Sequence, residues 1–277
     1  MKRAALSVAV LLFVLMVSSR GTTAQQDAAR PQPVYKDIGA QPGHLPKVHY
    51  IPSHAADSSY PSWVDASMVL NADGSLNTDL LGPSAVIILK ALRANAPPGQ
   101  GCLAVGHTFY DMIGRPERNT PEQAARNSRF VLLGTVTERT YGVGGDEPGQ
   151  LLRITPDEII KGQPLNVPAY FVFLPAGRFK IGNLEICKTD DFYTEPPAVG
   201  EQVLLFVPDS WEWRQNQGDP YLNVLDESGI ITIHADATVS LPRPFRTSLK
   251  MAPLSSDALL SSVRPVAGEG TTSQPSQ

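Results

Sequence analysis

The sequence predicts a mainly β fold, a small barrel or sandwich, from three observations. Five short runs rich in β-branched and aromatic residues follow one another between Phe130 and Val239. Each run is bounded by Gly, Pro or Asp, as strands are. The clearest helical patterns are short and lie outside these runs. The expected strands are residues 130–139, 151–155, 169–174, 203–207 and 230–234.

The first 24 residues have the pattern of a secretory signal peptide. Lys2 and Arg3 precede an apolar run from Ala4 to Val17, and small residues lead up to Ala24. An uncleaved membrane anchor is the alternative, but this run is shorter than the roughly 20 apolar residues that span a bilayer. We therefore expect cleavage after Ala24, a secreted or periplasmic protein, and no transmembrane helix afterwards.

Charge limits the classes of partner. The chain carries a formal charge of −4, and loss of the leader with its three basic residues, Lys2, Arg3 and Arg20, moves this to −7. An acidic chain without a basic stripe is a poor ligand for nucleic acid or anionic lipid. We therefore expect a partner that is another exported or envelope protein.

Residues 25–60 are rich in Pro, Gln, Ala and Ser and show no apolar period, which predicts an extended or disordered arm. His44, His49 and His54 lie within it at intervals of five. A metal-binding tract is one interpretation. Prolines interrupt the tract, and no carboxylate or Cys is interleaved with the histidines, so the sequence favours no metal and no other cofactor.

Residues 61–100 predict a small extension that docks on the β domain. Pro83 suits the first turn of a helix over 83–94, with Ala85, Ile88, Leu89 and Leu92 along one face. A second helix is indicated by Thr120 as N-cap, Pro121 at the first helical position and Gln123 at the capping-box position.

The β domain is expected over 101–240. Its first two strands are joined by the glycine-rich stretch 141–149, which lacks the residues of a phosphate loop and predicts a hairpin loop. Pro156 predicts that the second strand bulges or lies at an edge. The tail, 241–277, predicts one docking helix with Leu254, Leu259 and Val263 inward, and disorder beyond Pro265.

The segment from Val207 to Tyr221 is the candidate binding loop. It holds Trp211, Trp213, Arg214 and Tyr221, the residue types that dominate binding hot spots. The alternative is that the tryptophans cover the end of the β domain as part of its core.

Cys102 and Cys187 are the two cysteines of the chain. An even count in an exported protein favours one disulfide, and two buried thiols are the alternative. A bridge closing about 85 residues would contribute roughly 4–5 kcal/mol at most in the chain-entropy model.

The run 122–138 (EQAARNSRFVLLGTVTE) resembles the opening of exported bacterial domains related to the tissue inhibitors of metalloproteinases and netrin-like modules. Similar pieces are 157–162 (DEIIKG), Cys187 and 199–207 (VGEQVLLFV). The resemblance covers about 101–239 and implies a five-stranded OB-type barrel with short flanking helices, and Cys102 tied to Cys187. The inhibitors chelate the protease zinc through an N-terminal cysteine, whereas Cys102 lies far inside this chain, so the resemblance implies a fold and no activity.

The functional expectation is an exported, non-enzymatic binding module. A structural envelope protein and a metalloprotease-inhibitor-like protein remain alternatives. Catalysis has the least support, because no mechanism-bearing motif occurs and the acidic residues at 190–191 and 226–227 lie in loops. His234, at the end of an expected strand, is the lone histidine that a catalytic interpretation would use, and such histidines are more often structural.

Overall fold

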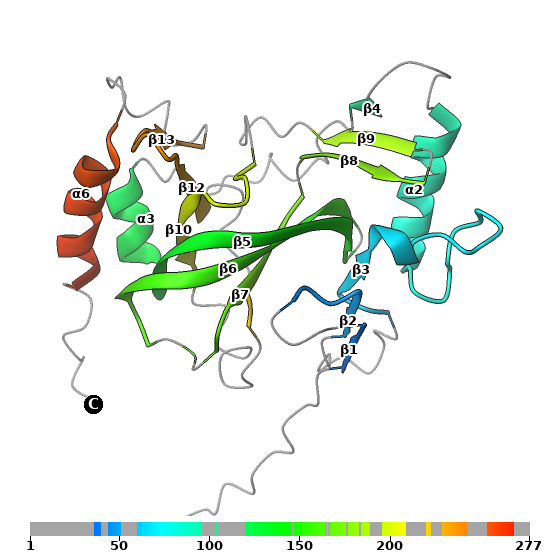
Figure 1. Cartoon of the computed structure of the whole chain (residues 1–277), viewed down its shortest axis with the longest axis horizontal. Helices are drawn as coiled ribbons and strands as arrows, with labels where there is room; N and C mark the ends of the chain where they lie inside the picture. Colours follow the sequence, from blue (N-terminus) through cyan, green and yellow to red (C-terminus); the bar gives the residue numbers. More distant parts are fainter. Residues whose placement is uncertain are drawn as a thin grey trace, which may run out of the picture. The chain divides into compact units, whose positions relative to one another are not determined.

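Two long antiparallel strands, β5 (Phe130–Gly144) and β6 (Glu147–Lys161), form the centre of the fold in the computed structural model (Figure 1). The structure describes residues 36–39, 44–50, 60–95, 103–104, 120–145, 147–163, 165, 167–175, 177–182, 184–188, 196–208, 220–222, 229–242 and 254–268. All of them belong to one compact unit, Val34–Gln277. The expected leader, 1–24, lies outside the described residues.

The remaining elements are short. The strands are β1 (Lys36–Ile38), β2 (Val48–Tyr50), β3 (Trp63–Asp65), β4 (Leu103–Ala104), β7 (Tyr170–Leu174), β8 (Gly177–Ile181), β9 (Leu184–Lys188), β10 (Gln202–Val207), β11 (Tyr221–Leu222), β12 (Ile230–Ile233) and β13 (Val239–Ser240). The helices are η1 (Ala66–Met68), α2 (Pro83–Asn95), α3 (Pro121–Asn127) and α6 (Ser256–Gly268). The fold is mainly β with short helices, as the sequence predicts.

The described strands form a ten-stranded sheet and a three-stranded sheet, β4-β9-β8. In the large sheet, one edge of β5 pairs with β6, and the other pairs first with β10 and then with β3. Beyond these, β12 and β13 follow β10, β1 and β2 follow β3, and β7 and β11 follow β6. The large sheet does not close into a barrel among the described residues, so the expected five-stranded OB-type barrel is not confirmed. The sheet is larger because residues 36–65 add three strands to it.

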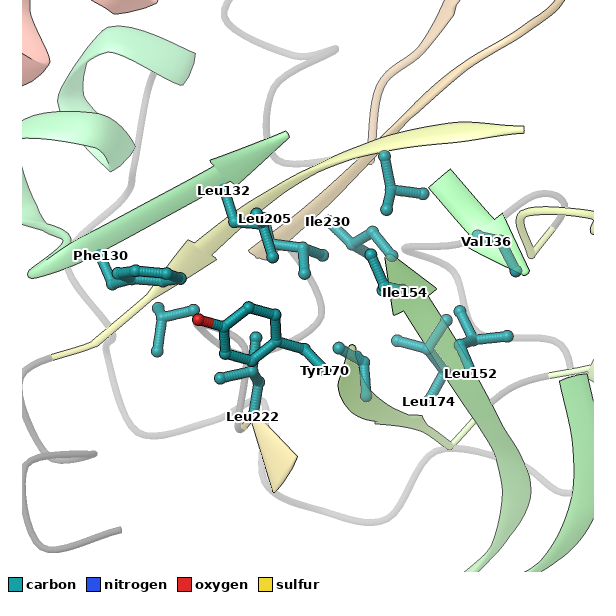
Figure 2. Packing of buried hydrophobic residues seen from close by; sticks show 13 residues of the cluster. Phe130, Leu132, Val136, Leu152, Ile154, Tyr170, Leu174, Leu205, Leu222 and Ile230 are labelled. Atoms are coloured by element: carbon teal, nitrogen blue, oxygen red, sulfur yellow. The ribbon is translucent and has the colours of Figure 1, made fainter. Parts of the chain in front are cut away.

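The main core lies on the inner face of β5, β6, β7 and β10. Figure 2 shows side chains from these strands and from β11 and β12 pointing toward one another, with Phe130, Leu152, Tyr170 and Leu205 among them. All four are at most 1 % exposed. The outer face of β5, β10 and β12 is covered by α3 and α6, which pack against each other. Because β5 is covered on both faces here, its first five residues are all buried.

Helix α3 has the predicted start. Thr120 Oγ1 accepts a hydrogen bond from the backbone N of Gln123 at 3.2 Å, as an N-cap residue does. At its C-terminal end, Lys161 Nζ donates to the carbonyl oxygens of Ala125 and Arg126 at 3.1 and 3.0 Å. A cation at this end satisfies free carbonyls and is favourable with the helix dipole.

Helix α6 begins and ends later in the chain than expected. Leu259 and Val263 are fully buried, as predicted, whereas Leu254 precedes the helix and packs against the same cluster from outside it. However, the helix continues past Pro265 to Gly268, where disorder was expected. Pro265 removes one helical hydrogen bond. Burial of Ala267, 1 % exposed, and packing of Val266 on the same cluster offset this loss.

Part of the expected arm joins the sheet. β2 pairs with β3 and β1 pairs with β2, so a segment expected to be extended or disordered contributes two strands. Asp65, 4 % exposed, fixes this region by accepting hydrogen bonds from Lys47 Nζ at 3.0 Å and Thr140 Oγ1 at 2.6 Å. Burial tends to raise the pKa of the Asp65 carboxyl, but hydrogen bonds from Ser67, Thr140 and Lys47 outweigh it, so this pKa is lowered.

The glycine-rich stretch 141–149, expected to be a loop, lies mostly within β5 and β6. Gly142 and Gly149 are paired across the hairpin. A Cβ on Gly142 would meet the Val64 carbonyl oxygen and, at 2.9 Å, the Trp63 ring. One on Gly149 would meet the Leu174 carbonyl oxygen at 2.5 Å and the Phe173 ring at 2.6 Å. The glycines therefore let neighbouring carbonyl groups and aromatic rings lie directly on the backbone. The bulge predicted at Pro156 is confirmed. Pro156 of β6 pairs with Gly134 of β5, and the register of the two strands shifts between Leu133 and Gly134.

Candidate functional site

Of the four residues expected in the binding loop, the structure describes Tyr221 alone. Trp211, Trp213 and Arg214 lie outside the described residues. Tyr221 lies in β11 and is 6 % exposed, so its ring is part of the core and not of a contact surface. Its ring stacks on the His49 ring, with the two centroids 3.6 Å apart, and its centroid lies 4.9 Å from that of the Phe171 ring.

The ends of the segment 208–220 are both anchored in the sheet. Val207, 0 % exposed, ends β10, and its carbonyl accepts a hydrogen bond from Arg129 N at 3.0 Å. At the other end, the Pro220 carbonyl accepts from Phe171 N at 2.9 Å, directly before the buried Tyr221. The segment is therefore held at both ends by buried residues of the sheet.

The three histidines of the arm do not share one site in the part of the chain that the structure describes. His49 is buried under Tyr221, and His44 Nδ1 lies 3.4 Å from Glu138 Oε2. His54 is outside the described residues. The described residues contain no group of three or more His, Cys, Asp or Glu side chains that could hold a metal ion.

Cys187 lies in β9 and Cys102 lies outside the described residues. The strand that directly follows Cys102, β4, pairs with β9, and its Ala104 is the partner of Cys187. The backbone therefore brings the flank of Cys102 beside the strand that carries Cys187. No disulfide is found within the described residues, and the predicted pairing stays a prediction.

A hydrogen-bonded chain of three side chains joins Glu201, His234 and Ser240. His234 Nδ1 lies 2.6 Å from Glu201 Oε1, and His234 Nε2 lies 2.6 Å from Ser240 Oγ. The other carboxylate oxygen, Glu201 Oε2, accepts from the backbone N of Ala198 at 2.7 Å. The imidazole of His234 is thus held between the Ser240 hydroxyl and the Glu201 carboxylate, and the carboxylate is fixed in turn by the hydrogen bond from Ala198 N.

When the imidazole is neutral, the chemistry of the three groups determines which atom donates in each of the two hydrogen bonds. An ionised carboxylate can only accept, so the proton between Glu201 and His234 is on Nδ1. Nε2 then carries a lone pair and accepts, so the Ser240 hydroxyl must be the donor. This is the tautomer in which a histidine can take a proton from a serine.

Strand ends place these three residues. Glu201 directly precedes β10, His234 directly follows β12, and Ser240 ends β13. Strands β10 and β12 are paired, as are β12 and β13. A hydrogen bond of 2.9 Å from His234 N to the Thr238 carbonyl closes the turn between β12 and β13.

Of these residues, the sequence indicated only His234, and as a structural histidine. Glu201 and Ser240 were missed, because Glu201 is 33 residues from His234 and sits in a turn, and no sequence motif connects them. The only available signal was the pairing of the strands that carry them.

No protein-family model matches this chain, and no curated protein matches it either. Within the described ranges, no helix is long and apolar enough to cross a membrane.

Proposed function

We propose that the chain is an exported binding module whose contact surface is the segment between β10 and β11, with Trp211, Trp213 and Arg214 as its anchors. The observation that carries this proposal is the anchoring of both ends of the segment, at Val207 and at Tyr221. Loops held on a rigid scaffold are common sites of binding.

Composition and anchoring together favour this segment over other loops. Trp and Arg are enriched among residues that dominate binding free energies. Fixing the ends of a loop lowers the conformational entropy that remains to be lost when a partner binds. Tyr221 takes the role of an internal anchor in place of the contact role that its residue type suggested.

We further propose that the sheet is a partly open barrel of the OB type. Such barrels have a Greek-key arrangement and need not be fully closed. The support is that β5 is paired on both edges, and that β11, beside β7, is followed in sequence by β12, beside β10. Export to a secreted or periplasmic location is likewise a proposal and rests on residues 1–24.

The inhibitor alternative has a structural cost. A free amine at Cys102 would require removal of everything before it, including β3 and α2. These elements cover a buried cluster that includes Val143, Ile181 and Ile186. A chain beginning at Cys102 would expose that cluster. Metalloprotease inhibition is therefore assayed with the mature chain and with a chain beginning at Cys102, and no inhibition by either would end this alternative.

The test is capture of a partner from native envelope and culture fluid with the mature chain as bait. The Trp211→Ala/Trp213→Ala double variant is compared with Tyr60→Ala, which removes an exposed aromatic ring outside the segment. Circular dichroism checks that all baits fold. The captured protein is then purified and its affinity measured against each bait.

The proposal predicts that the partner binds the unmutated chain and Tyr60→Ala equally. The double variant should bind at least about 30-fold more weakly, since hot-spot truncations cost about 2 kcal/mol or more. Equal affinity for all three baits contradicts the proposed surface. Capture of nothing favours a structural envelope protein.

A further inference from the structure

Glu201, His234 and Ser240 have the connectivity of an acid, a base and a nucleophile. Triads of this kind are recognised by geometry and roles, not by order in the sequence. Both imidazole contacts, at 2.6 Å, lie within the range at which a base activates a hydroxyl. We propose that Ser240 is an activated nucleophile and that this triad transfers acyl groups from esters, an activity beyond the binding function proposed above.

The three groups remain reachable from solvent. The side chains of His234 and Glu201 are 29 % and 23 % exposed, and Ser240 is half-buried. A fully buried network of the same kind would serve only stability. Partial exposure lets a small ligand approach the Ser240 hydroxyl while the strands keep the three groups in place.

A strained turn supports the site. Ala237 has a φ of 63°, the left-handed region, and is the one residue other than glycine with a positive φ in the described part of the chain. This conformation is unfavourable for a residue with a Cβ. Ala237 lies between His234 and Ser240, and its amide donates to the His234 carbonyl at 2.9 Å. Strain of this kind is concentrated at functional sites.

The reaction balances with an ester and water alone. In the first step the Ser240 oxygen bonds to the ester carbonyl carbon while its proton moves to His234 Nε2. The bond from carbon to the alcohol oxygen then breaks, and the alcohol leaves with that proton. Water repeats both steps on the acyl-serine, which releases the carboxylic acid and restores the Ser240 hydroxyl. Glu201 is a positioning residue, because it touches only the imidazole.

The surrounding charges select the class of ester. Glu201 and the exposed Asp236, two residues from His234, both carry carboxylates. An anionic acyl group would be repelled there. The site therefore suits esters with an uncharged acyl group.

The test is covalent labelling of the mature chain with an alkyl fluorophosphonate, located by peptide mass spectrometry. The Ser240 oxygen bonds to phosphorus, the bond from phosphorus to fluorine breaks, fluoride leaves, and the hydroxyl proton moves to His234 Nε2. We expect label on Ser240. His234→Ala should slow labelling at least about 100-fold, the lower end of what a positioned general base contributes.

Glu201→Gln tests the positioning role, because an amide no longer forces the proton onto Nδ1. The rate at saturating probe should fall at least tenfold while circular dichroism shows that the variant is folded. Ser75 is the matched control, since its Oγ donates to Asp73 Oδ1 at 2.6 Å and not to an imidazole. Ser75→Ala should label like the unmutated chain, and Ser240→Ala should not label.

The same variants are then assayed with p-nitrophenyl acetate, for which a burst of p-nitrophenol equal to the labelled fraction is expected. Label on Ser240 that depends on His234, with this burst, supports the proposal. No label in a folded chain, label at Ser240 that persists in His234→Ala, or equal label on Ser75 overturns it and leaves the three residues as a structural network.

Discussion

Gln150 is the residue whose replacement should most clearly stabilise the protein. Its side chain is 0 % exposed, and neither amide atom has a hydrogen-bond partner among the described residues. Gln150 pairs with Tyr141 on one side and Leu174 on the other. It shares a face of β6 with Leu152, a residue of the main core, so its amide lies on the core side of the strand.

We expect Gln150→Met to raise the free energy of unfolding by about 2 kcal/mol. A buried polar group without a partner costs about 1–3 kcal/mol, and methionine has a similar length without polar hydrogens. For a domain of this size, the change corresponds to a rise in Tm of about 4–8 °C. The magnitude follows from the amide alone, because the new side chain fills nearly the same volume.

Urea unfolding followed by circular dichroism measures the effect. Leu152→Met is the matched control, since it changes the next side chain on the same face from one apolar type to another and should cost less than about 1.5 kcal/mol. If Gln150→Met were less stable than the unmutated chain while Leu152→Met behaved as expected, the Gln150 amide must form favourable hydrogen bonds, and the reasoning would be refuted.

Three further predictions concern charge and covalent structure. Asp65→Asn should flatten the pH dependence of the free energy of unfolding below about pH 5. Because the pKa of Asp65 is lowered by folding, its ionised carboxylate stabilises the fold above the unfolded-state pKa of about 3.9, and this stabilisation is lost as pH falls through the folded-state pKa. Parallel acid-unfolding curves for Asp65→Asn and the unmutated chain would contradict this. Lys161→Met should lower the free energy of unfolding, measured in urea titrations, by about 0.5–1 kcal/mol, because two carbonyls at the end of α3 lose a cationic donor. An unchanged urea midpoint would show that this contact is solvent-screened. Thiol titration of the denatured, unreduced mature chain should find no free thiol, and two reactive thiols would remove the bridge predicted between Cys102 and Cys187.

The predicted strands and helices had strong local signals. Runs such as 203–207 are continuously apolar because both faces of β10 are covered, and this pattern is visible without a structure. The start of α3 was equally visible, because Thr120 and Pro121 occupy positions set by the chemistry of helix ends.

Other features depend on partners that are distant in the sequence. β1 and β2 are three residues each and lie among prolines, so only the pairing of β2 with β3 and of β1 with β2 makes them strands. The glycines of β5 and β6 have poor strand propensity and were predicted as a loop, although the rings of Trp63 and Phe173 require them.

The candidate sites show the same division. The aromatic loop could be found from its composition, but the burial of Tyr221 depends on His49, more than 170 residues away. The contact between His234 and Glu201 depends on strand register, which the sequence alone does not reveal.

Fluorescence quenching by acrylamide tests the proposed contact surface most directly. The chain has three tryptophans, and Trp63, 1 % exposed, is the internal reference for a shielded ring. The Trp63→Phe variant reports only Trp211 and Trp213, and the Trp211→Phe/Trp213→Phe variant reports only Trp63. The proposed function predicts strong quenching in the first variant, close to that of the urea-unfolded chain, and weak quenching in the second. Equally weak quenching in both would place Trp211 and Trp213 in the core and contradict the proposed binding surface.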